Sequence, residues 1–314
     1  MKKTYKIRKQ LENYGAQIAL AVLVLIVCII SPEFRSLHNI LSLLRQSAIN
    51  GIIAFGMTCV ILTGGIDLSV GSILCLSSLL CADMIKSGIP VFWAMSAALL
   101  IGLAQGSING LMIVKGKLQP FIATLVSMTA YRGIAMIFSN GRPISNLGKS
   151  TLLYNLGKGS FLGIPIPVLL FALLFAIFYI LLKHTVFGRQ IYATGSNSKA
   201  ALLAGISVDK VRFIVYGISG FTSALTGLIL VSRLSSAQPT MGTGFELDAI
   251  AAVALGGTSM SGGRGKILGT LTGVLIIATL NNSMNILGIS SYYQQVAKAV
   301  VILLAVLSDK KKGS

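Results

Sequence analysis

Five polar side chains lie within or beside long apolar runs, where they could form hydrogen bonds away from bulk water. Asp67 stands between two such runs in LTGGIDLSVGS, and Asn281 and Asn282 stand inside one in IATLNNSMNILG. Glu246 and Asp248 lie at the start of a further apolar run. Polar groups at membrane depth are costly and tend to face a cavity or a neighbouring helix. These five residues are therefore candidates for the lining of a path for a polar solute.

Each of these positions also has a purely structural interpretation. An Asp ahead of an apolar run can cap a helix by accepting hydrogen bonds from its first free N–H groups, so Asp67 is also a candidate N-cap. Asparagines within a run can join two helices by hydrogen bonds, which is the alternative for Asn281 and Asn282.

A long polar and basic segment, KHTVFGRQIYATGSNSKAALLAGISVDKVR, separates two apolar runs at residues 183–212. Ser196, Asn197 and Ser198 are N-cap candidates ahead of KAALLA, and Gly205 is a suitable helix end. The pattern predicts a short amphipathic helix between two glycines. Such a helix is either a docking element for a soluble partner or a helix that lies on the membrane surface.

The composition requires that most of the surface face an apolar medium. Of the 314 residues, 54% are hydrophobic and 11% are charged, whereas a soluble domain carries about 25% charged residues. A helix needs about 20 apolar residues to cross a bilayer. The sequence predicts an all-α polytopic membrane protein, a single domain over residues 1–314 with about ten transmembrane helices. The predicted crossings lie at 15–31, 46–63, 68–86, 91–114, 119–139, 165–183, 211–233, 246–258, 265–287 and 292–308.

Two features refine this prediction. The run at 246–258 is short for a full crossing, so we expect it to be tilted, broken or re-entrant. The 34 glycines predict membrane helices that approach each other closely, because small residues permit backbone contact.

The basic residues predict the orientation. The chain has 26 Lys and Arg against 8 Asp and Glu, and most basic clusters fall in alternate gaps between the apolar runs. Lys and Arg concentrate in cytoplasmic loops, so the N-terminal segment 1–14, the loop 184–212 and the C-terminal segment 309–314 are predicted to be cytoplasmic. Because these residues sit in short gaps, they indicate membrane topology and contact with lipid headgroups, and no nucleic-acid partner is predicted.

Catalytic signatures are weak in this sequence. NLGKST resembles the end of a phosphate-binding loop, but the position that needs the first glycine holds Pro143. SMSGGRG resembles a signature of ATP-hydrolysing transport subunits, yet no other part of such a domain accompanies it. Two histidines and no HExxH motif give few ligands for a catalytic metal. We therefore expect no catalytic residue, no metal and no cofactor bound by this chain.

A short internal echo relates GGIDLSVG at 64–71 to GGTSMSGG at 256–263. Transporters often contain internal repeats. The echo predicts two helix breaks beside a pathway.

Several long segments resemble one known family. LTGGIDLSVGS, GKLQPFIATL, YATGSNSKAALLAGI and the run from Arg233 to Lys312 are similar to the permeases of bacterial ATP-binding-cassette (ABC) importers for simple sugars such as ribose. The resemblance covers nearly the whole chain, apart from the first forty residues.

The resemblance implies a set of partners and a location. Two permease copies would form the pore, a separate subunit would dock on the cytoplasmic loops and hydrolyse ATP, and an extracytoplasmic binding protein would deliver the sugar. The location would be the bacterial inner membrane. The helix Ser196–Ala204 would be the coupling helix for the ATPase, and its flanks Arg189, Gly195 and Gly205 match the family pattern. The residues that couple to the ATPase would be Arg189, Gly195, Ser196, Asn197, Lys199, Ala200 and Gly205. The family's glycine before the asparagine is Ser196 here.

Two other functions fit a polytopic chain. A carrier coupled to protons or sodium usually has ionisable residues at the midplane, and here only a few carboxylates lie near the runs. A scaffold or receptor that transports nothing is the other alternative.

Overall fold

The computed structural model describes residues 2–300 and 303, and most of them are helical. The helices are α1 Lys2–Ile30, η1 Pro32–Arg35, α2 Leu37–Leu62, α3 Val70–Lys86, α4 Val91–Val114, α5 Pro120–Ser139, α6 Thr151–Lys158, α7 Ile166–His184, α8 Val186–Ser196, α9 Ser198–Leu203, α10 Val208–Leu234, α11 Phe245–Leu255 and α12 Ile267–Ile286. Residues 291–300 are also helical. Two antiparallel pairs of short strands join β1 Ile144–Ser145 with β4 Ser236–Ala237, and β2 Ser160–Phe161 with β3 Ile164–Pro165.

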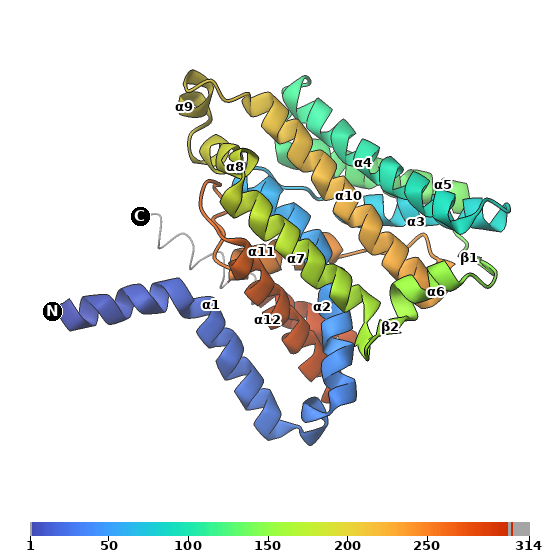
Figure 1. Cartoon of the computed structure of the whole chain (residues 1–314), viewed down its shortest axis with the longest axis horizontal. Coiled ribbons are helices and arrows are strands. Elements are labelled where there is room, and N and C mark those ends of the chain that lie inside the picture. The colour runs from blue at the N-terminus through green and yellow to red at the C-terminus, as the bar shows by residue number, and fades with distance from the viewer. Residues whose placement is uncertain (1, 301–302, 304–314) are drawn as a thin grey trace.

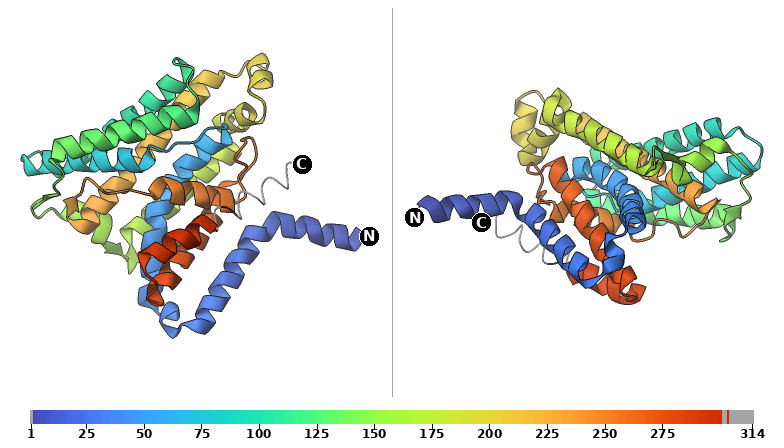
Figure 2. Two further views of the ribbon diagram at one scale, coloured as in Figure 1. Left: turned by 180° about the vertical axis from the view of Figure 1, so that it is seen from behind. Right: turned by 60° about the horizontal axis from the view of Figure 1, so that its bottom comes forward.

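The long helices form one bundle in which α2 and α10 are central, and the N-terminal end of α1 projects away from the others (Figures 1 and 2). Every predicted apolar run coincides with a helix or, for 292–308, begins as one. The end of that run and the predicted cytoplasmic segment 309–314 lie outside the described residues. Residues 2–14, predicted to precede the first crossing, continue α1 as helix.

The predicted count of ten crossings is not confirmed. Within the described part of the chain, six helices are long and apolar enough to span a membrane, namely α2, α4, α5, α7, α10 and α12, and the apolar part of α1 is shorter. Helix α3 has 17 residues and α11 has 11. At about 1.5 Å per residue, α11 covers about half of a hydrocarbon core. Helix α11 is therefore shorter than a full crossing, and the tilted, broken or re-entrant arrangement of 246–258 stays a prediction.

Small residues bring α4 and α10 into backbone contact. Gly102 and Gly106 on α4 face Gly220 on α10, and a Cβ atom on any of the three would collide with the opposite backbone. Apolar attraction between helices is absent in lipid, so close packing of this kind supplies the association. The prediction of close glycine packing is confirmed for this pair.

Two helices of the bundle are preceded by non-helical backbone. Residues 63–69 lead into α3, and residues 235–244 lead from the end of α10 through β4 into α11. The second segment contacts the first turn of α3, because a Cβ on Gly242 would lie 2.7 Å from the Gly71 carbonyl oxygen. The thiol of Cys75 on α3 also donates to the carbonyl of Pro239 at 3.2 Å. Irregular backbone at membrane depth is tolerated where protein covers it or where it lines a water-filled cavity.

Candidate translocation path and coupling element

Asp67 lies in the break before α3 and is fully buried. Its Oδ1 accepts hydrogen bonds from the Ser69 N–H at 3.0 Å and the Ser69 hydroxyl at 2.6 Å, and its Oδ2 accepts one from the Ser219 hydroxyl on α10 at 2.7 Å. Asp67 is not the N-cap of α3, as one interpretation of the sequence predicted. Helix α3 begins at Val70 after Ser69, and Asp67 accepts its hydrogen bonds from the turn that precedes the helix. The carboxylate holds the non-helical break against α10. Its place in a solute path stays a prediction.

The two asparagines of α12 behave differently from each other. Asn282 forms a reciprocal amide pair with Asn39 at the start of α2, with N···O distances of 2.8 and 3.0 Å. This is the interhelical hydrogen bonding that the sequence left open as an alternative. Asn281 is 4% exposed, and its Oδ1 is buried without a hydrogen-bond partner among the described residues.

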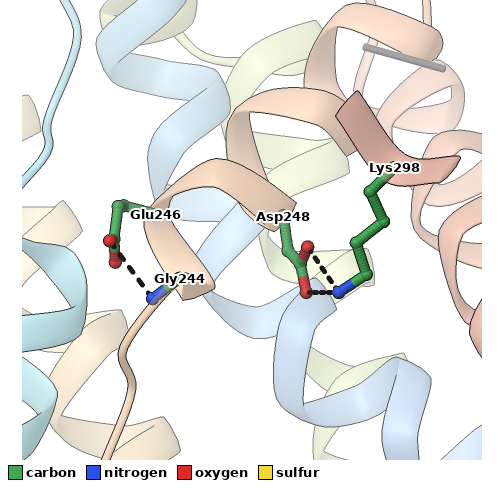
Figure 3. A network of polar contacts seen from close by, with 4 residues as sticks. All are labelled: Gly244, Glu246, Asp248 and Lys298. Carbon is green, nitrogen blue, oxygen red and sulfur yellow. Dashed lines mark hydrogen bonds and ion pairs between the residues drawn. The ribbon is translucent and has the colours of Figure 1, made fainter. Parts of the chain in front are cut away.

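Glu246 and Asp248 lie in the first turn of α11 and point to different sides of it (Figure 3). Asp248 forms an ion pair with Lys298 of the helical segment 291–300, with 3.0 Å from Nζ to Oδ1 and to Oδ2. Glu246 is half-buried and accepts a hydrogen bond from the Gly244 N–H at 3.2 Å. The other oxygen of Glu246 faces Gly71, where a Cβ would lie 2.6 Å away.

The structure adds Arg132, which sequence reasoning did not single out. It lies past the middle of α5, and its Nη1 donates to the carbonyls of Pro239 at 2.9 Å and Met241 at 2.8 Å. A lone arginine in a predicted crossing was the available signal, since an ionisable group inside a membrane helix marks a functional position by default. Its partners are more than a hundred residues away in sequence, so spacing could not reveal them.

The predicted helix of the loop 184–212 is α9, which begins two residues later than expected. Asn197 is its N-cap, and its Oδ1 accepts from the Ala200 N–H at 3.0 Å. Gly205 ends it in the left-handed region at φ 81°. The Gly205 N–H donates to the Leu202 carbonyl and the Ile206 N–H to the Ala201 carbonyl, both at 3.0 Å, which is the Schellman arrangement that favours glycine.

Ser196 belongs to the preceding helix, α8, whose presence the sequence reasoning missed. Thr185 was the missed signal, because its hydroxyl caps α8 by accepting from the Gly188 N–H at 3.0 Å. A helix pair, not a single short helix, therefore fills the loop between α7 and α10.

The tip of this pair is exposed and apolar. Leu202 and Leu203 are 64% and 90% exposed. Three of the predicted coupling residues, Arg189, Lys199 and Ala200, are exposed as well. Protruding apolar side chains beside cations fit both alternatives that the sequence left open, a docking element for a partner and a helix on the membrane surface.

Gly195, by contrast, lies at a junction inside the protein. Three segments meet there, because a Cβ on Gly195 would collide with the Leu62 carbonyl at the end of α2 and lie 2.6 Å from the Gly263 nitrogen. The Gly263 N–H itself donates to the Leu62 carbonyl at 2.9 Å. We call the residues Leu62, Gly195 and Gly263 the backbone junction.

Tyr192 ties α8 to the same loop. Its hydroxyl donates to the Gly265 carbonyl at 3.0 Å, and burial raises the pKa of this hydroxyl above its usual value. The echoed segments 64–71 and 256–263 also touch here, since a Cβ on Gly262 would lie 2.8 Å from the Gly64 nitrogen. Both echoed segments contain the expected helix breaks.

The remaining motifs give no catalytic arrangement. Ser150 in NLGKST caps the short helix α6 by accepting from the Leu153 N–H at 3.4 Å. Among the described residues, no group of three His, Cys, Asp or Glu side chains is placed to hold a metal ion.

Comparison with known protein families matches residues 39–306 to the family described as branched-chain amino acid transport system / permease component. The chain belongs to this family of permeases. The permease is 56% identical to the ribose import permease protein RbsC of Bacillus subtilis over 97% of this chain and 94% of that one. It is 49% identical to RbsC of Escherichia coli K12, over 98% and 97% of the two chains. Identity to the D-allose transport system permease protein AlsC of Escherichia coli is 38%, over 95% and 92%. No solved structure matches the permease.

The predicted resemblance to transport permeases is confirmed by these matches. The chain is thus a multi-pass component of a membrane transport system, not an enzyme.

Proposed function

We propose that this chain is the membrane permease of an ABC importer that takes ribose into a bacterial cell. The observation that carries the proposal is the 56% identity to a ribose import permease across nearly the full length. Permeases named for D-allose and L-arabinose are 38% and 36% identical over similar lengths.

The proposal includes the partners and the energy source. A second copy of the chain completes the pore, an extracytoplasmic protein binds ribose tightly and delivers it, and lipid surrounds the pair. A separate ATP-binding subunit hydrolyses ATP, and this chain binds no cofactor. We assign the docking of that subunit to α8 and α9, with Leu202 and Leu203 as the contact tip.

In the proposed topology the chain crosses the inner membrane ten times, and both termini lie in the cytoplasm. Residues 63–69 with α3, and 235–244 with α11, complete two crossings that are helical over only part of their length. The backbone junction supports this topology, because alternation from a cytoplasmic N-terminus puts Leu62, Gly195 and Gly263 on one side. Asn39 and Asn282 fall together on the opposite side.

In the proposed cycle the chain is a passive gate. ATP binding closes the two ATPase subunits and moves α9, and the backbone junction passes this displacement to the end of α2 and to the loop before α12. The end of α2 and the loop before α12 lie beside the helix breaks. Their displacement moves the broken helices, so the path opens alternately to each side of the membrane. The ATPase acts here as the ligand that shifts the permease between its outward-open and inward-open states. It can do so only because it binds the two states with different affinity.

The test is uptake of radiolabelled ribose by liposomes that contain this chain, with and without the ATPase, the binding protein and internal ATP. We expect ribose uptake only with all components, and competition by unlabelled ribose exceeding that by allose or arabinose. Uptake by this chain alone, or uptake abolished by an ionophore while ATP stays high, would indicate a carrier and refute the proposal.

A further inference from the structure

A patch of polar atoms lies on the face formed by α5 and the start of α11. Arg132 and Glu246 are half-buried, and Thr240 and Thr243 are exposed. We call these four residues the polar patch. They surround the non-helical backbone of 238–244, and Arg132 is tied to that backbone by its two hydrogen bonds to carbonyls.

The polar patch cannot face lipid. Arg132 lies on a helix that is long and apolar enough to cross the membrane, between the exposed apolar residues Val126 and Ile137. Charged groups at that depth, and backbone that is not in a helix, must face protein or water. An exposed patch of this kind therefore faces either the proposed second copy of the chain or a water-filled space, and the first experiment below separates the two.

The chemistry of the patch suits a neutral polyhydroxylated solute. A guanidinium offers five N–H donors in a planar fork, and toward the described part of the chain only Nη1 of Arg132 donates to carbonyls. The Glu246 carboxylate adds acceptors, the Thr240 hydroxyl can donate and accept as sugar hydroxyls do, and the Thr243 hydroxyl, which donates to the Thr240 carbonyl at 2.8 Å, adds an acceptor. No ion pair joins Arg132 to a carboxylate among the described residues, so its donors are not consumed by a salt bridge.

The patch is also at the place where two helices begin. Glu246 is held between Gly244, ahead of α11, and Gly71, in the first turn of α3. Discontinuous helices in transporters put substrate sites at such breaks near the midplane. Motion of α3 against α11 would thus change the distance between donors and acceptors, which allows weak binding that is gained and lost during a cycle.

We propose that Arg132 and Glu246, with Thr240 and Thr243, form the transient sugar-binding site within the membrane. This inference rests on the proposed function for the identity of the sugar, but the water-filled site itself does not. Asp67 and Asn282 are engaged by protein partners and have no part in this site.

The first experiment measures access of water. Thr243→Cys is assembled with the ATPase and binding protein in liposomes and treated with a membrane-impermeant cationic methanethiosulfonate, with and without ATP and ribose. Ile137→Cys, 79% exposed on the apolar face of α5, is the matched control, and the unsubstituted chain gives the background from its own cysteines. We expect labelling of Thr243→Cys but not of Ile137→Cys, and slower labelling with ribose.

Each outcome has a distinct meaning. Protection by another sugar but not by ribose supports the site and refutes ribose as the substrate. Labelling of Thr243→Cys that is as slow as that of Ile137→Cys in every state overturns the site. Labelling that no sugar slows overturns its role in binding.

The second experiment separates sugar contact from a structural tie. Arg132→Lys retains a cationic donor for the carbonyls of residues 239 and 241 but loses the planar fork. We expect ribose uptake to fall about tenfold or more in Arg132→Lys and in Glu246→Gln, since a charged hydrogen bond to the sugar is lost. ATPase co-purification should be unchanged, and Thr129→Val, one turn away on α5, should transport normally. Uptake by both variants at the rate of the unsubstituted chain overturns the proposal.

Discussion

The ion pair between Asp248 and Lys298 gives the most quantitative prediction. The Lys298 Nζ lies 3.0 Å from both carboxylate oxygens, and the two side chains are only 23% and 11% exposed. Replacing one partner of a largely buried pair leaves the other charge without compensation, at a cost of about 3–5 kcal/mol. We expect Lys298→Met to lower the free energy of unfolding by this amount.

The double variant separates charge from packing. With Asp248→Asn added to Lys298→Met, no bare charge is left, and removal of both members of a buried pair is often close to neutral. We therefore expect the double variant to regain most of the lost free energy, which a double-mutant cycle would register as strong coupling.

The assay is reversible unfolding of the purified chain in detergent or mixed micelles, followed by tryptophan fluorescence or circular dichroism. Lys158→Met is the control, because Lys158 is exposed and bonds only the Ser235 hydroxyl at 2.8 Å among the described residues, so its loss should cost about 0.5 kcal/mol or less. If Lys298→Met is no less stable than that control, or if the double variant is as unstable as the single one, the pair does not hold the last described helix to α11.

Three further predictions concern single residues. Gly205→Val should weaken ATPase co-purification and uptake while membrane insertion is normal, because φ 81° strains a β-branched residue. Asparagine tolerates this backbone conformation, so Gly205→Asn should retain both ATPase co-purification and uptake. Equal behaviour of the two variants would refute the assignment of Gly205 as the helix cap. Gly195→Ala should leave ATPase binding intact but lower the amount of ribose taken up per ATP hydrolysed, since the added Cβ collides with the Leu62 carbonyl. If the ratio of uptake to ATP hydrolysis is unchanged, the backbone junction does not transmit the motion of α9. Asp67→Asn should lower the free energy of unfolding by about 1–3 kcal/mol, because a buried hydroxyl of Ser219 or Ser69 loses a charged acceptor. A thermal unfolding temperature equal to that of the unsubstituted chain would contradict this.

Much of the secondary structure could be predicted because its causes are local. The run at 91–114 coincides with α4, since hydrophobic residues and the prolines and charges that interrupt them mark membrane helices directly. The cap at Asn197 and the left-handed Gly205 were also readable, because a cap needs only a side chain and the next few N–H groups. Helices α6 and α8 were missed, as both are short and lie in polar segments without an apolar run.

The sites could be predicted only in part. Glu246 and Asp248 were chosen as one pair beside a path, whereas the structure turns them to different sides of α11, Asp248 to a lysine and Glu246 to the polar patch. Arg132 was overlooked because its partners lie on a distant segment of the chain.

Hydrophobicity, capping and motif identity are properties of neighbouring residues, so the sequence was enough to place the chain in a membrane, to locate its long apolar helices and to indicate its family. Which polar groups meet became visible only in the folded chain. Asn282 pairs with Asn39, Lys298 with Asp248, and Gly195 contacts the end of α2. These contacts depend on how each helix is rotated and how closely glycines allow it to approach its neighbour, and that is settled by packing across the whole bundle.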